Sequence, residues 1–237
     1  MATFYDSFSE YYDQLGVSDY SLKLGRGFLS YWKDNFPEES MQSHLDVCCG
    51  TGTLCGFMKE HGIDTTGYDL SEGMIRKARQ NYPGINFIVA DAAEFNDGRQ
   101  YDFATCTDDA VNHITEPEIV KKAFRTTANE LRQGGLFFFD LNIAEKLQIG
   151  DPYTKGLNAE EELIYHIVRT SEKTIEVRVT HQCRGIIDWQ DKVCERMYSE
   201  DEIRQYLREA GLELLECRND FYEATRPVKN IYIARKS

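Results

Sequence analysis

Short apolar runs alternate with amphipathic stretches between residues 44 and 141, and glycine or polar residues separate them. Apolar runs between turn residues predict buried strands, and stretches in which apolar residues recur at helical spacing predict helices. Strands are predicted over 44–48, 65–68, 85–90, 101–107 and 136–141, and helices over 53–61, 71–81 and 116–132. This alternation favours βαβ units, which build a mostly parallel sheet with helices on both faces.

Two more helices are predicted before the first strand, over residues 4–15 and 20–35. Apolar residues such as Phe28 and Trp32 recur at helical spacing in the second one, and Pro37 follows its end.

After residue 142 the pattern changes to strands with no helix between them. These strands are predicted over 161–170, 174–183 and 186–198. Within the middle one, apolar side chains alternate with charged ones, which is the period-2 pattern of a half-buried antiparallel strand. We expect these residues to form a small antiparallel sheet.

The last part of the chain predicts a helix over 200–209 and two strands, 212–218 and 228–235, that can pair antiparallel. Ser71 and Ser199 stand directly before predicted helices and are the expected N-caps. The predicted fold class is therefore doubly wound α/β, with a seven-stranded, mostly parallel sheet and an inserted small antiparallel β-sheet.

Composition excludes several classes of partner and location. Asp and Glu number 40 and Lys and Arg 27, so the net charge of −13 argues against nucleic acid and against an anionic membrane surface. Seven cysteines without a C-x-x-C pair fit neither a disulfide framework nor a zinc site. The acidic start lacks the pattern of a signal peptide, and no apolar run is long enough to cross a bilayer. We expect a cytoplasmic protein, either a monomer or a homodimer.

The turn after the first predicted strand carries the clearest chemical signal. Gly50-Thr51-Gly52 connects a strand to a helix, the place where α/β sheets bind cofactors, and glycine lets ligand atoms approach the backbone. A dinucleotide fingerprint needs a third glycine, where this chain has Cys55, and no Lys or Arg stands in 45–58 to hold a phosphate. Asp46, just before the glycines, points to a ligand with positive charge.

Two more acids follow the next two predicted strands. Asp69 ends the second strand, where a carboxylate can accept hydrogen bonds from ribose hydroxyls, and Asp91 follows the third, where it can accept from an adenine amino group. Together with Asp46 they line one crevice at the carboxyl ends of the strands. A nucleoside with a cationic amino-acid tail and no phosphate fits them, and S-adenosylmethionine is such a molecule.

At these residues the chain resembles the class I S-adenosylmethionine-dependent methyltransferases. The resemblance rests on residues 46–52, on Gly67-Tyr68-Asp69-Leu70-Ser71 and on Ala90-Asp91-Ala92, and it covers about residues 40–142. The family's usual first glycine is Cys48 in this chain.

The N-terminal residues indicate which subgroup of this family the chain resembles. Phe4-Tyr5-Asp6-x-Phe8 and the tyrosines after it are similar to a small-molecule subgroup that includes the sugar N,N-dimethyltransferases, which also carry an antiparallel insertion after the fifth strand. In such relatives an N-terminal tyrosine reaches the methionine end of the cofactor, and the candidates here are Tyr12 and Tyr20.

The resemblance implies a set of site residues. The implied cofactor-binding residues are Tyr12, Tyr20, Asp46, Cys49, Gly50, Gly52, Asp69, Leu70, Met74, Asp91, Ala92, Thr107 and Asp108. Residues 1–142 and 199–237 would form the cofactor-binding domain, with the N-terminal helices 1–36 as a lid. Residues 143–198 would cover the substrate pocket.

The implied reaction is a direct, in-line methyl transfer to a nitrogen or oxygen of a small molecule, with no metal. His113 is the candidate general base, and the alternative is a histidine that caps or packs a short helix. Asn142, His166 and His181 are weaker candidates. The alternatives are a nicotinamide-dependent oxidoreductase on the same kind of sheet and a non-catalytic module that binds S-adenosylmethionine.

Overall fold

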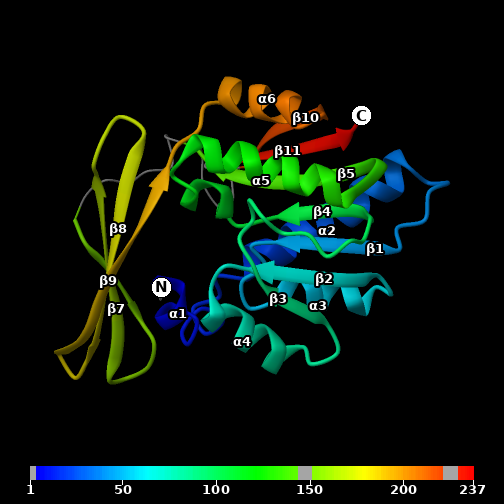
Figure 1. The fold of residues 1–237 in the computed structure, drawn as a ribbon. Coiled ribbons are helices and arrows are strands. Elements are labelled where there is room, and N and C mark those ends of the chain that lie inside the picture. The colour runs from blue at the N-terminus through cyan, green and yellow to red at the C-terminus, as the bar shows by residue number, and fades with distance from the viewer. Residues whose placement is uncertain (1–3, 144–150, 221–228) are drawn as a thin grey trace.

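The computed structural model describes residues 4–143, 151–220 and 229–237, which contain two separate β-sheets (Figure 1). The large sheet has the order β10-β11-β5-β4-β1-β2-β3, and the small one the order β6-β7-β8-β9. The strands of the large sheet are β1 (Ser43–Val47), β2 (Asp64–Asp69), β3 (Asn86–Val89), β4 (Tyr101–Cys106), β5 (Leu131–Asn142), β10 (Leu212–Asp220) and β11 (Lys229–Lys236). Those of the small sheet are β6 (Tyr153–Gly156), β7 (Glu161–Arg169), β8 (Thr174–Cys183) and β9 (Ile186–Arg196).

Six α-helices and one 3₁₀-helix lie in the described residues. They are α1 (Phe4–Phe8), α2 (Asp19–Asn35), α3 (Thr53–Glu60), α4 (Glu72–Asn81), η1 (Ala110–His113), α5 (Pro117–Glu130) and α6 (Glu200–Glu209). Ser71 caps α4 by accepting a hydrogen bond from the backbone N–H of Met74 at 3.1 Å, and Ser199 forms a capping box with Glu202 on α6. Both predicted N-caps are confirmed.

The large sheet is parallel from β3 to β5, and β11 is antiparallel to both β5 and β10. The chain builds outward from β1 through β2 to β3, and then crosses to the other side of β1 to add β4 and β5. The strand order therefore reverses between β1 and β4. Open α/β sheets bind ligands in the crevice at such a reversal, outside the carboxyl ends of the strands.

Helices cover both faces of the large sheet because its central strands are apolar on both sides. On β5, Phe137 and Phe139 pack in the cluster that includes α5 and α6, while Leu136 and Phe138 pack with α2 and α3. The run of phenylalanines in one strand thus fills two layers of core.

The small sheet stands beside the carboxyl ends of the large one, with α1 between them (Figure 1). Phe8 of α1 packs on Leu163 and Val179, which lie on one face of the small sheet. The strand β9 then leads directly back toward α6 (Figure 1).

The predicted fold class is confirmed in its large sheet, its antiparallel small sheet and its antiparallel final pair. The strand β6 was not predicted, because it is short, lies at the exposed edge of the small sheet and has no apolar pattern. The predicted boundary between α5 and the fifth strand is wrong, since the helix ends at Glu130 and β5 begins at Leu131, which pairs with Tyr101. Residues 1–3, 144–150 and 221–228, which belong to the predicted domains, lie outside the described residues, and so does the first residue of the strand predicted over 228–235.

The helix predicted over 4–15 is wrong beyond Phe8, where the chain continues in turns to residue 18. Polar side chains of this N-terminal segment (residues 4–18) bond the main body instead. The Asp6 carboxylate accepts from the hydroxyl of Ser71 at 2.7 Å, and the Asp13 carboxylate accepts from the hydroxyl of Thr51 at 2.5 Å. These tertiary contacts outweigh the helical period. None of the helices in the described residues has the length and apolar character that a membrane span requires.

Candidate active site

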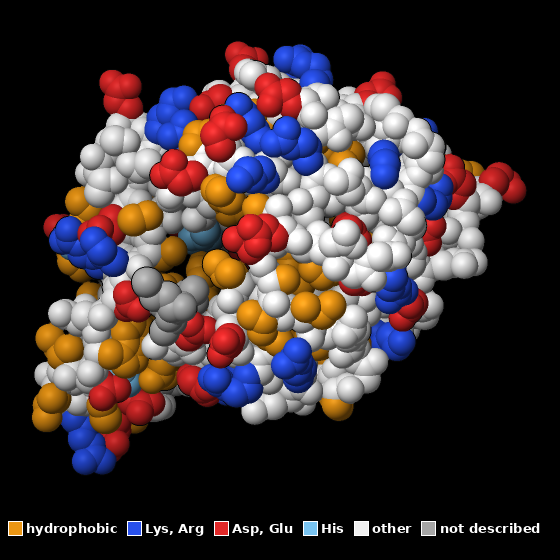
Figure 2. Space-filling model, viewed as in Figure 1, with side chains coloured by type: hydrophobic (Ala, Val, Ile, Leu, Met, Phe, Trp, Pro, Cys, Tyr) orange, Lys and Arg blue, Asp and Glu red, His pale blue; other side chains and the backbone are white. Residues whose placement is uncertain are grey.

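A cavity of about 380 Å³ lies at the carboxyl ends of β1, β2 and β4, between the N-terminal segment and β9. In Figure 2 the surface is hollowed between the small sheet and the large one, with hydrophobic and acidic side chains around the hollow. The predicted site residues that line the cavity are Tyr12, Gly50, Asp69, Leu70, Met74, Thr107, Asp108 and His113.

A recess of about 20 Å³ adjoins this cavity beside the glycine turn, and it is lined by Asp46 and Cys49 among others. Four predicted residues, Tyr20, Gly52, Asp91 and Ala92, line neither space. The structure thus brings together most of the predicted set.

The glycine turn is held in an unusual backbone conformation. Cys48, Gly50 and Gly52 have φ values of +56°, +55° and +80°, in the left-handed region. A Cβ on Gly50 would meet only the Tyr12 ring, at 3.8 Å, whereas a Cβ on Gly52 would lie 2.6 Å from the Phe87 ring. Gly50 therefore leaves room on the cavity side, and Gly52 leaves room for core packing.

Asp46 lies in a buried polar chain behind the turn. Its carboxylate accepts from the hydroxyl of Thr105 at 2.6 Å, and the same hydroxyl is 2.7 Å from Nε2 of His44. Burial raises the pKa of the Asp46 carboxyl to about 7 and lowers the pKa of the His44 imidazole to about 3. Because the His44 imidazole stays neutral, Asp46 is the one of these three hydrogen-bonded side chains that can carry charge toward the recess.

Asp69 ties β2 to the glycine turn. Its carboxylate accepts from the backbone N–H of Gly50 at 3.0 Å and from that of Ser71 at 2.9 Å. Burial raises the pKa of Asp69, and these two hydrogen bonds oppose the shift. Each carboxylate oxygen keeps acceptor capacity toward the cavity, since an ionised carboxylate offers about four acceptor sites.

Asp91, which follows β3, lines neither the cavity nor the recess. Its side chain is exposed and accepts from the backbone N–H of Ala93 at 2.8 Å, which fixes the turn after β3. Of the apolar candidates nearby, Leu70 is 58% exposed, while Met74 and Ala92 are buried.

The two candidate tyrosines differ. The Tyr12 hydroxyl donates to the Asp108 carboxylate at 3.3 Å, and its ring lies next to Gly50. The Tyr20 hydroxyl donates to Asp220 at 2.9 Å, and its ring lies 4.3 Å from Nζ of Lys229. Tyr12 faces the cavity, and Tyr20 packs behind it.

The turn between β4 and η1 forms the opposite wall. Asp108 and Asp109 have φ values of +60° and +52°, which residues other than glycine seldom adopt. The backbone N–H groups of both donate to the carboxylate of Asp140, at 2.7 and 3.0 Å. Sequence reasoning missed Asp140 and Lys229. For Asp140 the sequence did offer a signal, because this acid directly follows the run of phenylalanines in β5.

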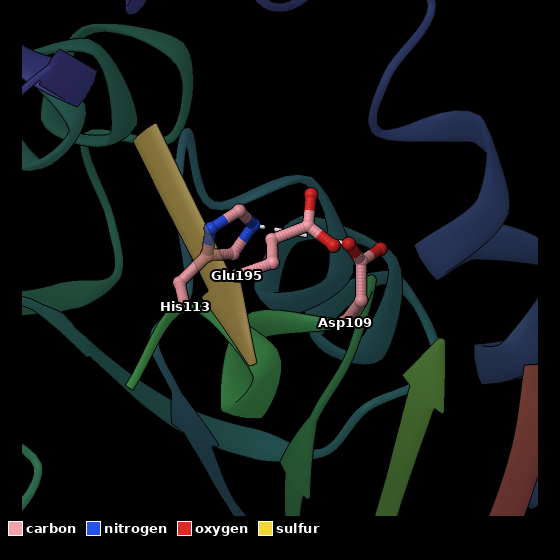
Figure 3. Close-up of side chains that lie close together, drawn as sticks. All are labelled: Asp109, His113 and Glu195. Carbon is pink, nitrogen blue, oxygen red and sulfur yellow. Dashed lines mark ion pairs between the residues drawn. The ribbon is translucent and has the colours of Figure 1, made fainter. Parts of the chain in front are cut away.

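A histidine and two acids meet beside the cavity (Figure 3). Nε2 of His113 is 2.9 Å from the Tyr5 hydroxyl and 3.8 Å from the Asp109 carboxylate. Each of Asp109, His113 and Glu195 offers an atom that could bind a metal, all within 4.8 Å of one another. Sequence reasoning missed Glu195, which comes from β9 and is 7% exposed.

The carboxylates of this cluster already accept hydrogen bonds from nitrogen. Asp109 accepts from Nζ of Lys229 and from Nδ2 of Asn142, both at 2.6 Å, and Glu195 accepts from the same Asn142 nitrogen at 3.1 Å. Nδ1 of His113 is buried and has no hydrogen-bond partner among the described residues, although a metal-bound imidazole normally donates from its other nitrogen. The cluster is therefore better suited to a protonated nitrogen than to a metal ion.

The remaining histidine candidates lie elsewhere. His181 is buried against the rings of Tyr11 and Trp189. His166 lines a depression of about 660 Å³ on the small sheet, and neither predicted cofactor residues nor the glycine turn take part in it.

Comparisons with known proteins relate this chain to methyltransferases. A family model described as a methyltransferase domain matches residues 45–135. A putative methyltransferase of Geobacillus sp. (strain WCH70) is 27% identical over 92% of each chain. A dTDP-3-amino-3,4,6-trideoxy-alpha-D-glucopyranose N,N-dimethyltransferase of Streptomyces venezuelae is 32% identical over 62% of this chain and 57% of its own.

A solved S-adenosylmethionine-dependent methyltransferase from Clostridium acetobutylicum ATCC 824 has the same fold, with a TM-score of 0.82 over 98% of this chain and 99% of that one, at 23% identity. The family match begins at β1 and spans the glycine turn, Asp69 and the turn after β4, which are the walls of the cavity. Residues 45–135 therefore form a methyltransferase domain, and the chain has the Rossmann-like fold of the S-adenosylmethionine-dependent methyltransferases.

Proposed function

We propose that this enzyme methylates an amino nitrogen of a small molecule, with an amino sugar as the first class to test. The observation that carries the proposal is the cluster of His113, Asp109 and Glu195 beside the cavity (Figure 3). Its acids favour a cationic ammonium over a neutral hydroxyl. Support also comes from the Streptomyces venezuelae relative, whose name gives it as an N,N-dimethyltransferase of an amino sugar.

The cavity would hold S-adenosylmethionine at its large-sheet side. Asp69 would accept from the ribose hydroxyls, and Gly50 would leave room for the methionine end, with Asp46 and Cys49 in the recess beside it. Leu70 and Met74 would pack near the adenine, and Asp91 with Ala92 would lie toward its edge. When bound, the cofactor supplies a methyl group on a positively charged sulfur.

The division into domains follows from this placement. Residues 1–142 and 199–237 would bind the cofactor, with residues 1–36 as the lid, and residues 143–198 would cover the acceptor. Two contacts support it in the described residues. Nε2 of Gln14 donates to the backbone oxygen of Leu157 at 2.8 Å, and Tyr11 packs on His181.

The protein's part in the reaction is to orient the acceptor and to receive a proton. Direct transfer from a sulfonium needs no covalent bond to the enzyme, so alignment of the two reacting atoms at close range supplies most of the acceleration. An ammonium nitrogen has no free lone pair, so Nε2 of His113 would first take a proton from it and leave a neutral amine to accept the methyl group. The Asp109 carboxylate, 3.8 Å away, would stabilise the resulting imidazolium. The two sheets and the N-terminal segment would exclude water.

The test is a methyl-transfer assay with labelled S-adenosylmethionine on pairs of sugars that differ only in an amino or a hydroxyl group at one carbon. The proposal expects an N-methyl product, and methylation of the hydroxyl partners alone would contradict it. His113→Asn should lower kcat by about 100-fold with unchanged affinity for S-adenosylhomocysteine. His166→Asn, on the depression of the small sheet, is the matched control and should retain activity.

A further inference from the structure

Lys229 is a buried cation that none of the steps above uses. It is the first residue of β11 and is 3% exposed. Its Nζ donates to Asp109 at 2.6 Å, to Asp140 at 2.9 Å and, at 3.3 Å, to Asp108. A buried ammonium is costly without such partners, and burial alone would lower its pKa. The three carboxylates instead raise the pKa of Lys229 well above its ordinary value.

The same network fixes a strained turn. Asp108 and Asp109 are both in the left-handed region, and such residues persist only where the surroundings hold them. Asp140 holds both by accepting their backbone N–H groups, and Lys229 binds the side chains of all three acids. Without the ammonium, three carboxylates would repel one another around this turn.

The turn connects the two halves of the active site. On one side, the Asp108 carboxylate accepts from the Tyr12 hydroxyl, whose ring lies beside Gly50 at the cofactor end of the cavity. On the other side, Asp109 lies 3.8 Å from His113. A change in the backbone of the turn therefore displaces groups in both halves together.

We infer that Lys229 and Asp140 are positioning residues for methyl transfer: they lock the turn between β4 and η1 in the conformation that completes the cofactor end of the cavity. Neither lines the cavity. Tyr20 helps to hold Lys229 in place, since the centre of its ring lies 4.3 Å from the Lys229 ammonium. The inference holds for a nitrogen or an oxygen acceptor alike.

The first experiment compares two lysines of one strand. Lys229→Met should weaken binding of S-adenosylhomocysteine by about tenfold or more, measured by calorimetry. Lys236→Met is the control, because Nζ of Lys236 donates to the backbone oxygen of Leu131 at the far end of β11. Wild-type affinity in Lys229→Met would overturn the inference.

A second pair of variants separates the conformation of the turn from charge and stability. Lys229→Met combined with Asp109→Gly or with Asp109→Ala removes the same two charges, but only glycine adopts the left-handed conformation freely. We expect the glycine variant to regain affinity to within a few fold of the wild type and the alanine variant to stay weak. Equal affinities in the two would overturn the inference. This comparison still tests the inference if Lys229→Met alone fails to fold. Both double variants lack the Asp109 carboxylate, so they bury one unpaired negative charge fewer than the single variant does.

Discussion

Replacing Asp69 with asparagine tests the proposed cofactor site at the end of β2. The change keeps the shape of the side chain but removes its charge and turns one acceptor oxygen into a donor. In the structure both oxygens are engaged, with the backbone N–H of Gly50 at 3.0 Å and that of Ser71 at 2.9 Å. An amide can accept only one of these, so its NH₂ group faces a second donor.

The expected magnitude follows from these contacts. A hydrogen bond to a charged acceptor contributes about 1.5–3 kcal/mol, and asparagine loses one backbone hydrogen bond and weakens those to the ribose hydroxyls. We expect a loss of about 3 kcal/mol in binding of S-adenosylhomocysteine, or roughly 100-fold in Kd.

Titration calorimetry of the wild type and Asp69→Asn measures this loss, with thermal unfolding to verify the fold. Asp64→Asn is the matched control, because Asp64 begins the same strand and forms an exposed ion pair with Arg99 at 2.6 Å. Such pairs contribute little, so the control should bind as the wild type does. An affinity of folded Asp69→Asn within about threefold of the wild type would refute the reasoning.

Three other changes test different parts of the structure. Gly52→Ala should lower the free energy of unfolding by about 2 kcal/mol more than Gly62→Ala does. Both glycines are in the left-handed region, but only a Cβ at position 52 would meet a ring, that of Phe87 at 2.6 Å. Equal losses in denaturant unfolding would contradict this. The Asp46 carboxyl has its pKa raised to about 7, so the native state keeps a proton that the unfolded state releases above about pH 4. The stability that this group contributes should therefore fall by about 3 kcal/mol as the pH rises from 4 to 7. Asp46→Asn should remove this part of the fall in unfolding curves across the range, and an unchanged slope would count against it. Tyr12→Phe removes a hydroxyl that donates at 3.3 Å, so calorimetry should give a loss in S-adenosylhomocysteine affinity of less than about tenfold, and a larger one would assign the hydroxyl a direct cofactor contact.

The large sheet was predictable because each of its strands carries its own signal. The run from Leu136 to Phe139 is apolar at every position and serves two core layers, so it marks a strand buried on both faces. Ser71 and Ser199 mark helix starts by chemistry that acts within one turn. Such local rules need no knowledge of distant parts of the chain.

The N-terminal segment could not be predicted in the same way. Its apolar residues have helical spacing, yet Asp6 and Asp13 bind Ser71 and Thr51, which are distant in sequence. Contacts of this kind override a weak local preference.

The acids of the site were partly predictable. Asp46 and Asp69 follow from their places at the ends of parallel strands, but the exposed position of Asp91 depends on how the turn after β3 folds back on itself. The network of Lys229 joins residues more than a hundred positions apart, so no spacing along the chain marks it. Glu195 reaches the cluster with His113 and Asp109 only because β9 packs beside η1, and the sequence does not show this contact.

The measurement that tests the account most directly is a crystal structure of the protein with S-adenosylhomocysteine. The account predicts the ribose hydroxyls within hydrogen-bond distance of Asp69, the amino-acid end beside Gly50 and Tyr12, and the sulfur directed toward His113. A ligand bound with its ribose away from Asp69, or in the depression lined by His166 on the small sheet, would contradict it.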